Sequence, residues 1–194
     1  MRANRLVVGL SAWFIVGGLV ASGAAEASSR ASAFRGDPTA VIGIIDSGIN
    51  PYHVVFRDDS PLAQKHPSTY IPGFPKTARA LELTLDAKDY KTAVGRDCEL
   101  WKNVKPGKLY WFPGTKIIGG ISFEEASDFD CGNTNFSTGR IIDGAGHGTM
   151  VASRAAGNGY GACPACRIVS IQGLTPGVEW AARNAEWIDV QSNS

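Results

Sequence analysis

The chain has 194 residues, which is long enough for one domain with a sizeable buried core. Its formal net charge is +1 and it contains no basic run, which argues against nucleic acid as a partner. Glycine is abundant, at 23 residues, but 44% of the residues are hydrophobic, so the composition favours tight turns in a folded domain over disorder.

Residues 1–27 have the pattern of a secretory signal peptide. Two arginines near the start precede an apolar stretch over 6–20, and Ala25-Glu26-Ala27 supplies small residues for cleavage. An uncleaved membrane anchor is the alternative, but glycines interrupt the apolar stretch and no basic stop follows it. We therefore expect a secreted, extracellular protein with no membrane association after signal removal, and a short linker over 28–40.

A continuous apolar run over 41–45 leads directly into Asp46, Ser47 and Gly48. Such a run followed by a turn predicts a strand buried on both faces, as found inside a parallel sheet. The strand would deliver Asp46 to the carboxyl edge of the sheet, where α/β proteins carry their chemistry. Because a carboxylate is costly to bury, Asp46 is a candidate functional residue.

The segment 54–115 is polar and rich in proline, and we interpret it as an insertion in the domain. Its aromatic residues offer apolar surface for docking, and a short helix is expected near 78–87. We expect an ordered insertion over the rim of the site, since long inserts in compact domains are usually functional or disordered. A mobile surface loop is the equally weighted alternative.

The remaining elements alternate between strands and helices. They are a strand over 116–123, a helix over 147–156, a strand over 167–172, a helix starting at Thr175-Pro176 and a strand over 188–192. This alternation predicts an α/β fold, a parallel sheet with flanking helices. The last strand is apolar and should be interior to a larger sheet, so we expect the domain to be incomplete at its C-terminus.

Each predicted helix has one face suited to packing on the sheet. In the first helix this face is made of small residues: Gly148, Ala152, Ser153 and Ala156. In the second helix it follows the i, i+3, i+4, i+7 rule: Val178, Ala181, Ala182 and Ala185.

Two motifs together carry a resemblance to a known family. Asp46-Ser47-Gly48 and the stretch His147-Gly148-Thr149-Met150-Val151-Ala152 resemble the aspartate and histidine motifs of the subtilisin family of serine endopeptidases. Lys116 to Gly120 is similar to the second core strand of that family, and 161–168 occupies the place of a further strand entry. The resemblance covers 41–194 and implies the N-terminal part of a subtilisin-like peptidase domain.

The resemblance implies a triad in which His147 is the general base and Asp46 orients and stabilises its ring. Taken alone, Asp46 would be a turn-forming residue and His147 a hinge residue among glycines. The serine motif of the family, Gly-Thr-Ser, does not occur in these 194 residues, so we expect the serine beyond the last residue and this chain alone to be inactive. Ser192, Asn193 and Ser194 would bind an extended polypeptide substrate.

The four cysteines are predicted to form disulfides in an oxidising compartment. Cys163 and Cys166 form a C-x-x-C sequence that enters a strand, whereas a thioredoxin-like motif begins a helix. A structural disulfide is therefore favoured over an oxidoreductase site. Cys98 would then pair with Cys131.

The predicted function is hydrolysis of peptide bonds by a secreted serine endopeptidase with an Asp-His-Ser triad. The alternative is a non-catalytic binding module of the same fold that has lost the serine. No cofactor or metal is expected: valines follow His53 where relatives supply a calcium carboxylate, and the glycine-rich stretches at 43–48 and 144–148 match nucleotide loops poorly.

Overall fold

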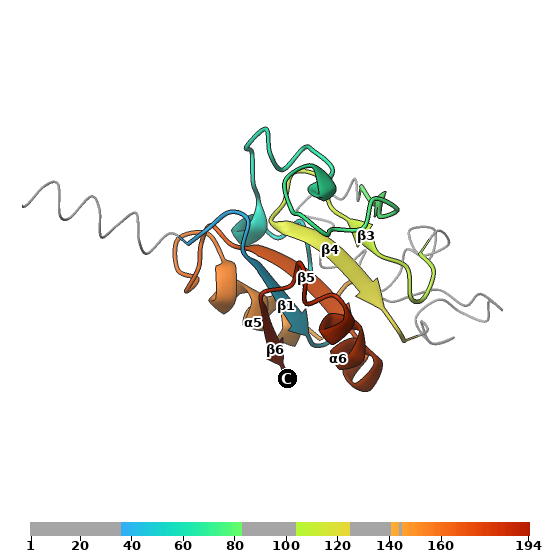
Figure 1. Cartoon of the computed structure of the whole chain (residues 1–194). Helices are drawn as coiled ribbons and strands as arrows, with labels where there is room; N and C mark the ends of the chain where they lie inside the picture. The colour runs from blue at the N-terminus through green and yellow to red at the C-terminus, as the bar shows by residue number, and fades with distance from the viewer. Residues whose placement is uncertain (1–35, 83–103, 125–140, 144) are drawn as a thin grey trace, which may run out of the picture. The chain divides into compact units, whose positions relative to one another are not determined.

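Figure 1 shows a central sheet with helices packed against it. The computed structural model describes residues 36–82, 104–124, 141–143 and 145–194. The elements are β1 Val41–Ile45, η1 Val54–Phe56, η2 Pro67–Thr69, β2 Arg79–Ala80, β3 Tyr110–Trp111, β4 Ile117–Ser122, α5 His147–Ala156, β5 Arg167–Gln172, α6 Leu174–Arg183 and β6 Val190–Asn193. The predicted signal peptide, most of the predicted linker, Cys98 and Cys131 lie outside the described residues.

The six described strands form one sheet in the order β2-β3-β4-β5-β1-β6. The neighbours β4, β5, β1 and β6 are all parallel, as the alternation of strands and helices predicts. Among the described strands, one pair departs from the parallel arrangement, because β3 runs antiparallel to β4. Only a few residues join these two strands, and a parallel pair needs a crossover connection of a dozen or more. The fold class is therefore α/β with a mixed, mostly parallel sheet.

The alternation of side chains along the central strands divides the core into two layers. Ile44 of β1 and Ile168 of β5 lie in one buried cluster with Ala152 and Ala156 of α5. Val41, Ile45, Val169 and Ile171 lie in a second cluster with Ala181 of α6. Because successive residues of a strand point to opposite faces, α5 and α6 cover opposite faces of the sheet. Both faces of β1 are thus buried, as its apolar run predicts.

The described parts of 54–115 pack on this core. Phe56, Ile71, Phe74 and Phe112 have exposed fractions of 3% or less. The helix expected near 78–87 is wrong at its start, because Arg79 and Ala80 form β2. The backbone amide of Leu81 donates to the carbonyl of Trp111, so pairing with β3 replaces helical hydrogen bonds there.

Helix α6 begins earlier than the cap and proline signals predict. Gly173 is the residue before the helix and has φ 102°, which lets the chain turn out of β5 at once. Thr175 and Pro176 consequently lie within the first turn, where proline removes no intrahelical hydrogen bond. Of the four residues predicted to face the sheet, Ala181 is buried, whereas Ala182 and Ala185 are exposed.

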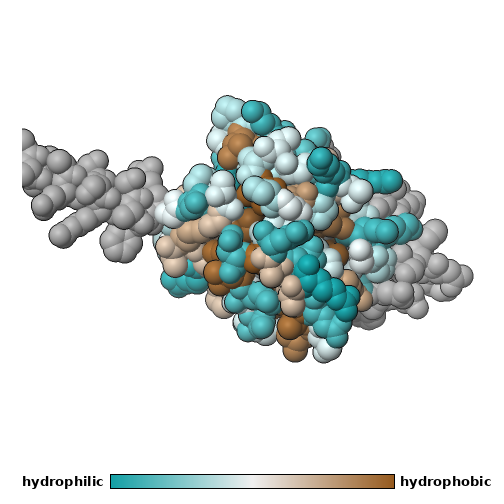
Figure 2. Space-filling view, in the orientation of Figure 1, coloured by the Kyte–Doolittle hydropathy of each residue, from teal (hydrophilic) through white to brown (hydrophobic). Residues whose placement is uncertain are grey.

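Polar and apolar areas alternate over the face drawn in Figure 2. The large apolar side chains with the greatest exposure come from different segments: Val54, Met150, Tyr160, Leu174 and Val190. Within the described ranges, no helix combines the length and hydropathy that crossing a bilayer requires.

Candidate active site

Asp46 lies directly after β1, at the carboxyl edge of the parallel strands. Its backbone amide donates to the carbonyl of Ile171 over 3.0 Å, which extends the β1–β5 pairing past the end of the strand. Its side chain is only 3% exposed, and Oδ1 accepts a 2.7 Å hydrogen bond from the amide of Ser47. The sheet therefore presents a buried, oriented carboxylate at this edge.

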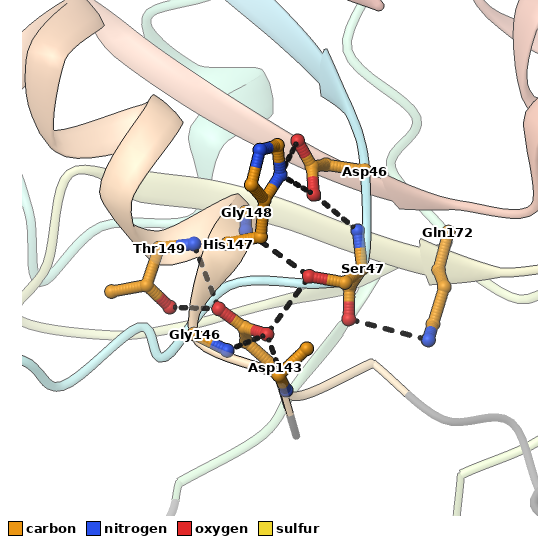
Figure 3. Close-up of polar contacts among 9 residues, drawn as sticks. Asp46, Ser47, Asp143, Gly146, His147, Gly148, Thr149 and Gln172 are labelled. Carbon is orange, nitrogen blue, oxygen red and sulfur yellow. Dashed lines mark hydrogen bonds and ion pairs between the residues drawn. The ribbon is translucent and has the colours of Figure 1, made fainter. Parts of the chain in front are cut away.

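His147 is the first residue of α5, and its ring faces Asp46 (Figure 3). Nδ1 lies 2.9 Å from Oδ1 and 3.0 Å from Oδ2 of Asp46. An ionised carboxylate can only accept hydrogen bonds, so the proton of the neutral ring is on Nδ1 and the lone pair is on Nε2. Within the described part of the chain, Nε2 has no hydrogen-bond partner, and the side chain is 53% exposed.

The electrostatic setting of His147 combines two opposed effects. A helix N-terminus disfavours a positive ring, whereas a neighbouring carboxylate favours it. The hydrogen bond to Asp46, followed by the charge of Asp46, raises the pKa of His147 above its ordinary value, and the carboxylate of Asp143 adds to the rise. The largest cause of the raised pKa of His147 is thus its hydrogen bond to Asp46.

Two glycines allow the helix and the turn after β1 to touch. A Cβ on Gly148 would lie 2.1 Å from the carbonyl oxygen of Gly48 and 3.1 Å from Cβ of Asp46. Gly48 itself has φ 100°, a conformation that side chains disfavour. The glycines that follow Asp46 and His147 are thus needed for the approach of the two residues.

Asp143 is a residue of this site to which sequence reasoning assigned no role. It is 2% exposed, and Figure 3 shows its carboxylate between the Ser47 turn and the first turn of α5. An aspartate a few residues before a predicted helix is a capping signal, which could have indicated it.

The three residues predicted to bind substrate lie beside Asp46. In the β1–β6 register, Ser192 is opposite Ile44 and Asn193 is opposite Ile45. The amide of Ser194 donates to the carbonyl of Ile45 over 3.2 Å. The structure therefore brings Asp46, His147 and 192–194 to one edge of the sheet.

The C-x-x-C sequence lies at the other end of the strands. Cys163 and Cys166 are joined in a disulfide immediately before β5 begins. The ammonium group of Lys116 donates to the carbonyl of Pro164 within this loop and, over 3.0 Å, to that of Ala156 at the end of α5. The disulfide loop thus belongs to the structural framework and does not contact the Asp46–His147 pair. Among the described residues, no three His, Cys, Asp or Glu side chains are grouped as a metal site would require.

The structure thus places an aspartate–histidine pair at the carboxyl edge of a mostly parallel sheet with helices on both faces. The chain matches the model of the subtilase family over residues 37–192, which is most of its length. It therefore belongs to the subtilase family, a family of serine peptidases. No curated protein and no solved structure was found to match it.

Proposed function

We propose that the chain supplies the general base and its orienting acid to a secreted serine endopeptidase. The observation that carries this is the hydrogen bond of His147 Nδ1 to both oxygens of the buried Asp46 carboxylate, with Nε2 directed away from it. The nucleophilic serine is contributed by sequence after Ser194. The family match to a serine peptidase supports this proposal.

In this proposal, Nε2 of His147 removes the proton of the serine hydroxyl as the hydroxyl attacks the peptide carbonyl. The same nitrogen then donates the proton to the leaving amine. Asp46 remains ionised, holds the proton of the ring on Nδ1 and stabilises the imidazolium that forms. The 53% exposure of the His147 side chain leaves Nε2 accessible to both partners.

The substrate is an extended polypeptide that pairs with the backbone of 192–194. This segment is at an edge of the described sheet and ends beside Asp46. An extended peptide there makes main-chain hydrogen bonds as an added strand. Export through the signal peptide over 1–27 would place the enzyme and its cysteines in an oxidising, extracellular space.

The test compares peptide hydrolysis by the complete protein with that of two histidine variants. We expect His147→Ala to lower kcat by about three or more orders of magnitude, because it removes the base. His53→Ala is the matched control, since His53 is exposed and its described contacts are a hydrogen bond from the amide of Val55 and an edge-on contact with the ring of Phe56. Near-normal hydrolysis by His147→Ala would overturn the proposal.

A second arm separates this function from a binding module that lacks the serine. A fluorophosphonate probe should label the complete protein but not a polypeptide of residues 28–194. Ser47 donates its hydroxyl to Asp143 and Ser153 donates to the carbonyl of Met150, so neither is poised for attack. Peptide binding without any labelling of the complete protein would favour the binding module.

A further inference from the structure

Helix α5 begins without a capping side chain. Its N-cap residue is Gly146, which has φ 85° and no side chain to accept a hydrogen bond from the first turn. The first amides of a helix have no partners within the helix and carry a positive partial charge. His147 is in this first turn. The group that binds these amides in place of a cap therefore also fixes the position of the His147 ring.

Asp143 replaces the missing cap from outside the helix. Its Oδ2 accepts 2.8 and 2.6 Å hydrogen bonds from the amide and hydroxyl of Thr149. Its Oδ1 accepts a 2.7 Å bond from the amide of Gly146 and a 3.0 Å bond from that of Ala145. Burial would raise the pKa of Asp143, but these hydrogen bonds hold it below its usual value. An ionised carboxylate is thus fixed against the positive end of α5.

Ser47 connects Asp143 to the turn that carries Asp46. Its hydroxyl donates to Oδ1 of Asp143 over 2.9 Å and accepts a 3.1 Å bond from the amide of Gly148. Ser47 directly follows Asp46, so the same carboxylate restrains the turn after β1 and the start of α5 (Figure 3). The side chain of His147 is half exposed and gains little restraint from packing.

We propose that Asp143 is the positioning residue of the Asp46–His147 pair: it fixes the first turn of α5 against the Ser47 turn and thereby keeps Nδ1 of His147 on the Asp46 carboxylate. Asp143 contacts neither the ring nor the reacting atoms. Its effect on turnover rests on the proposed function, whereas its effect on the ring of His147 is measurable without activity.

The test follows the imidazole of His147 by NMR in the complete protein. In Asp143→Asn, we expect the pKa of His147 to fall toward 6.5 and the 15N shifts to show loss of the pure Nδ1–H tautomer. Asp58→Asn is the matched control, because Asp58 is also mostly buried and hydrogen-bonded, but to Arg167 at the start of β5. It should leave both readouts of His147 unchanged, although it also lowers stability.

A second pair of variants separates positioning from the charge of Asp143 itself. Thr149→Val keeps that charge but removes a hydroxyl donor, whereas Thr149→Ser keeps the donor. In Thr149→Val, we expect the pKa of His147 to fall and the pure Nδ1–H tautomer to be lost, as in Asp143→Asn. In Thr149→Ser, both should remain near their wild-type values. If Asp143→Asn fails to fold, the two Thr149 variants still test the positioning role of Asp143.

The kinetic expectation is a loss of about a hundredfold in kcat for Asp143→Asn with little change in KM, the effect of a misplaced catalytic group. An unchanged pKa and tautomer of His147 in folded Asp143→Asn, or equal values in the two Thr149 variants, would overturn the positioning role. If the ring responds as expected but the wild-type protein hydrolyses no peptide, the proposed function fails and the positioning role stands.

Discussion

Asp46 and His147 differ in solvent exposure, and this difference suits acid–base chemistry. The side chain of Asp46 is 3% exposed and that of His147 is 53% exposed. A buried carboxylate with directional hydrogen bonds is held in one position, so it can orient the ring. An accessible ring nitrogen can exchange a proton with a reactant. The difference in exposure between the two residues follows from their positions at the end of β1 and the start of α5.

The raised pKa of His147 predicts a pH dependence of peptidase activity. Only the neutral ring is a base, so kcat/KM of the complete protein should rise with pH as the ring loses its proton. The midpoint of this rising limb should lie above pH 6.5, the ordinary pKa of histidine. In Asp46→Asn, kcat/KM should fall by about four orders of magnitude and the limb should move to lower pH. The measurement is the pH profile of kcat/KM for the two proteins. A limb at the same pH in both would contradict the role of Asp46.

The same shift has a consequence for stability with the opposite dependence on pH. The folded state binds the proton on His147 more tightly than the unfolded chain does. The resulting stabilisation is therefore complete below about pH 6.5 and is lost as pH rises through the folded pKa. The stability of His147→Ala should lack this component. The proposed peptidase activity should thus rise over the pH range in which this contribution to stability declines.

At the scale of elements, the site depends on how closely α5 approaches the turn after β1. The small residues on the buried face of α5 permit this approach, since Gly148, Ala152, Ser153 and Ala156 are all buried. The helix carries no cap of its own, so the approach is held by hydrogen bonds to the turn and to Asp143. Position and orientation of the histidine are thus properties of the helix–turn contact.

Gly148→Ala tests this contact. Alanine normally favours a helix over glycine by about 1 kcal/mol, but here its Cβ would meet the backbone carbonyl of Gly48 at 2.1 Å. We expect a net loss of about 2 kcal/mol in urea denaturation, with reduced activity. Gly177→Ala in α6 is the comparison with a smaller overlap, because its Cβ would meet Cγ2 atoms of Ile171 and Ile45 at 2.9 and 3.3 Å and no backbone atom so closely. Equal stability of the two variants would contradict the close contact at Gly148.

At the scale of the molecule, the sheet separates a structural end from a chemical end. The Asp46–His147 pair and 192–194 lie at the carboxyl edge of the parallel strands. The Cys163–Cys166 disulfide, the buried Lys116 and the Arg167–Asp58 ion pair lie at the opposite, amino end. The covalent and ionic restraints thus lie at the end of the sheet away from the Asp46–His147 pair.

The pairing of the remaining cysteines is a prediction for the whole chain. Cys98 and Cys131 lie outside the described residues, and we expect a disulfide between them. Closing a loop of about 34 residues should stabilise the protein by up to roughly 4 kcal/mol in the chain-entropy model. Peptide mapping without reduction should recover Cys98 linked to Cys131 and Cys163 linked to Cys166. Free thiols at 98 and 131, or crossed pairs, would contradict it.

Local patterns predicted much of this fold, whereas the proposed roles of Asp46 and His147 came from the family resemblance of their motifs. The strand over 41–45, the helix over 147–156 and the strand over 167–172 are confirmed residue for residue, because burial on one or both faces leaves a clear apolar pattern. Local signals failed where the decisive partner is distant in sequence. The pairing of Arg79 and Ala80 with β3 depends on neighbours that no local pattern contains.

The sequence by itself determined which residue types stand at the ends of the elements: an aspartate after a buried strand, a histidine at the start of a helix and two cysteines before another strand. Only the tertiary structure decided that Asp46 and His147, 101 residues apart, meet within 2.9 Å and that Asp143 joins their two elements. The physical reason is that residue type and burial pattern are local, whereas a hydrogen bond across elements depends on the packing of all the strands and helices between them.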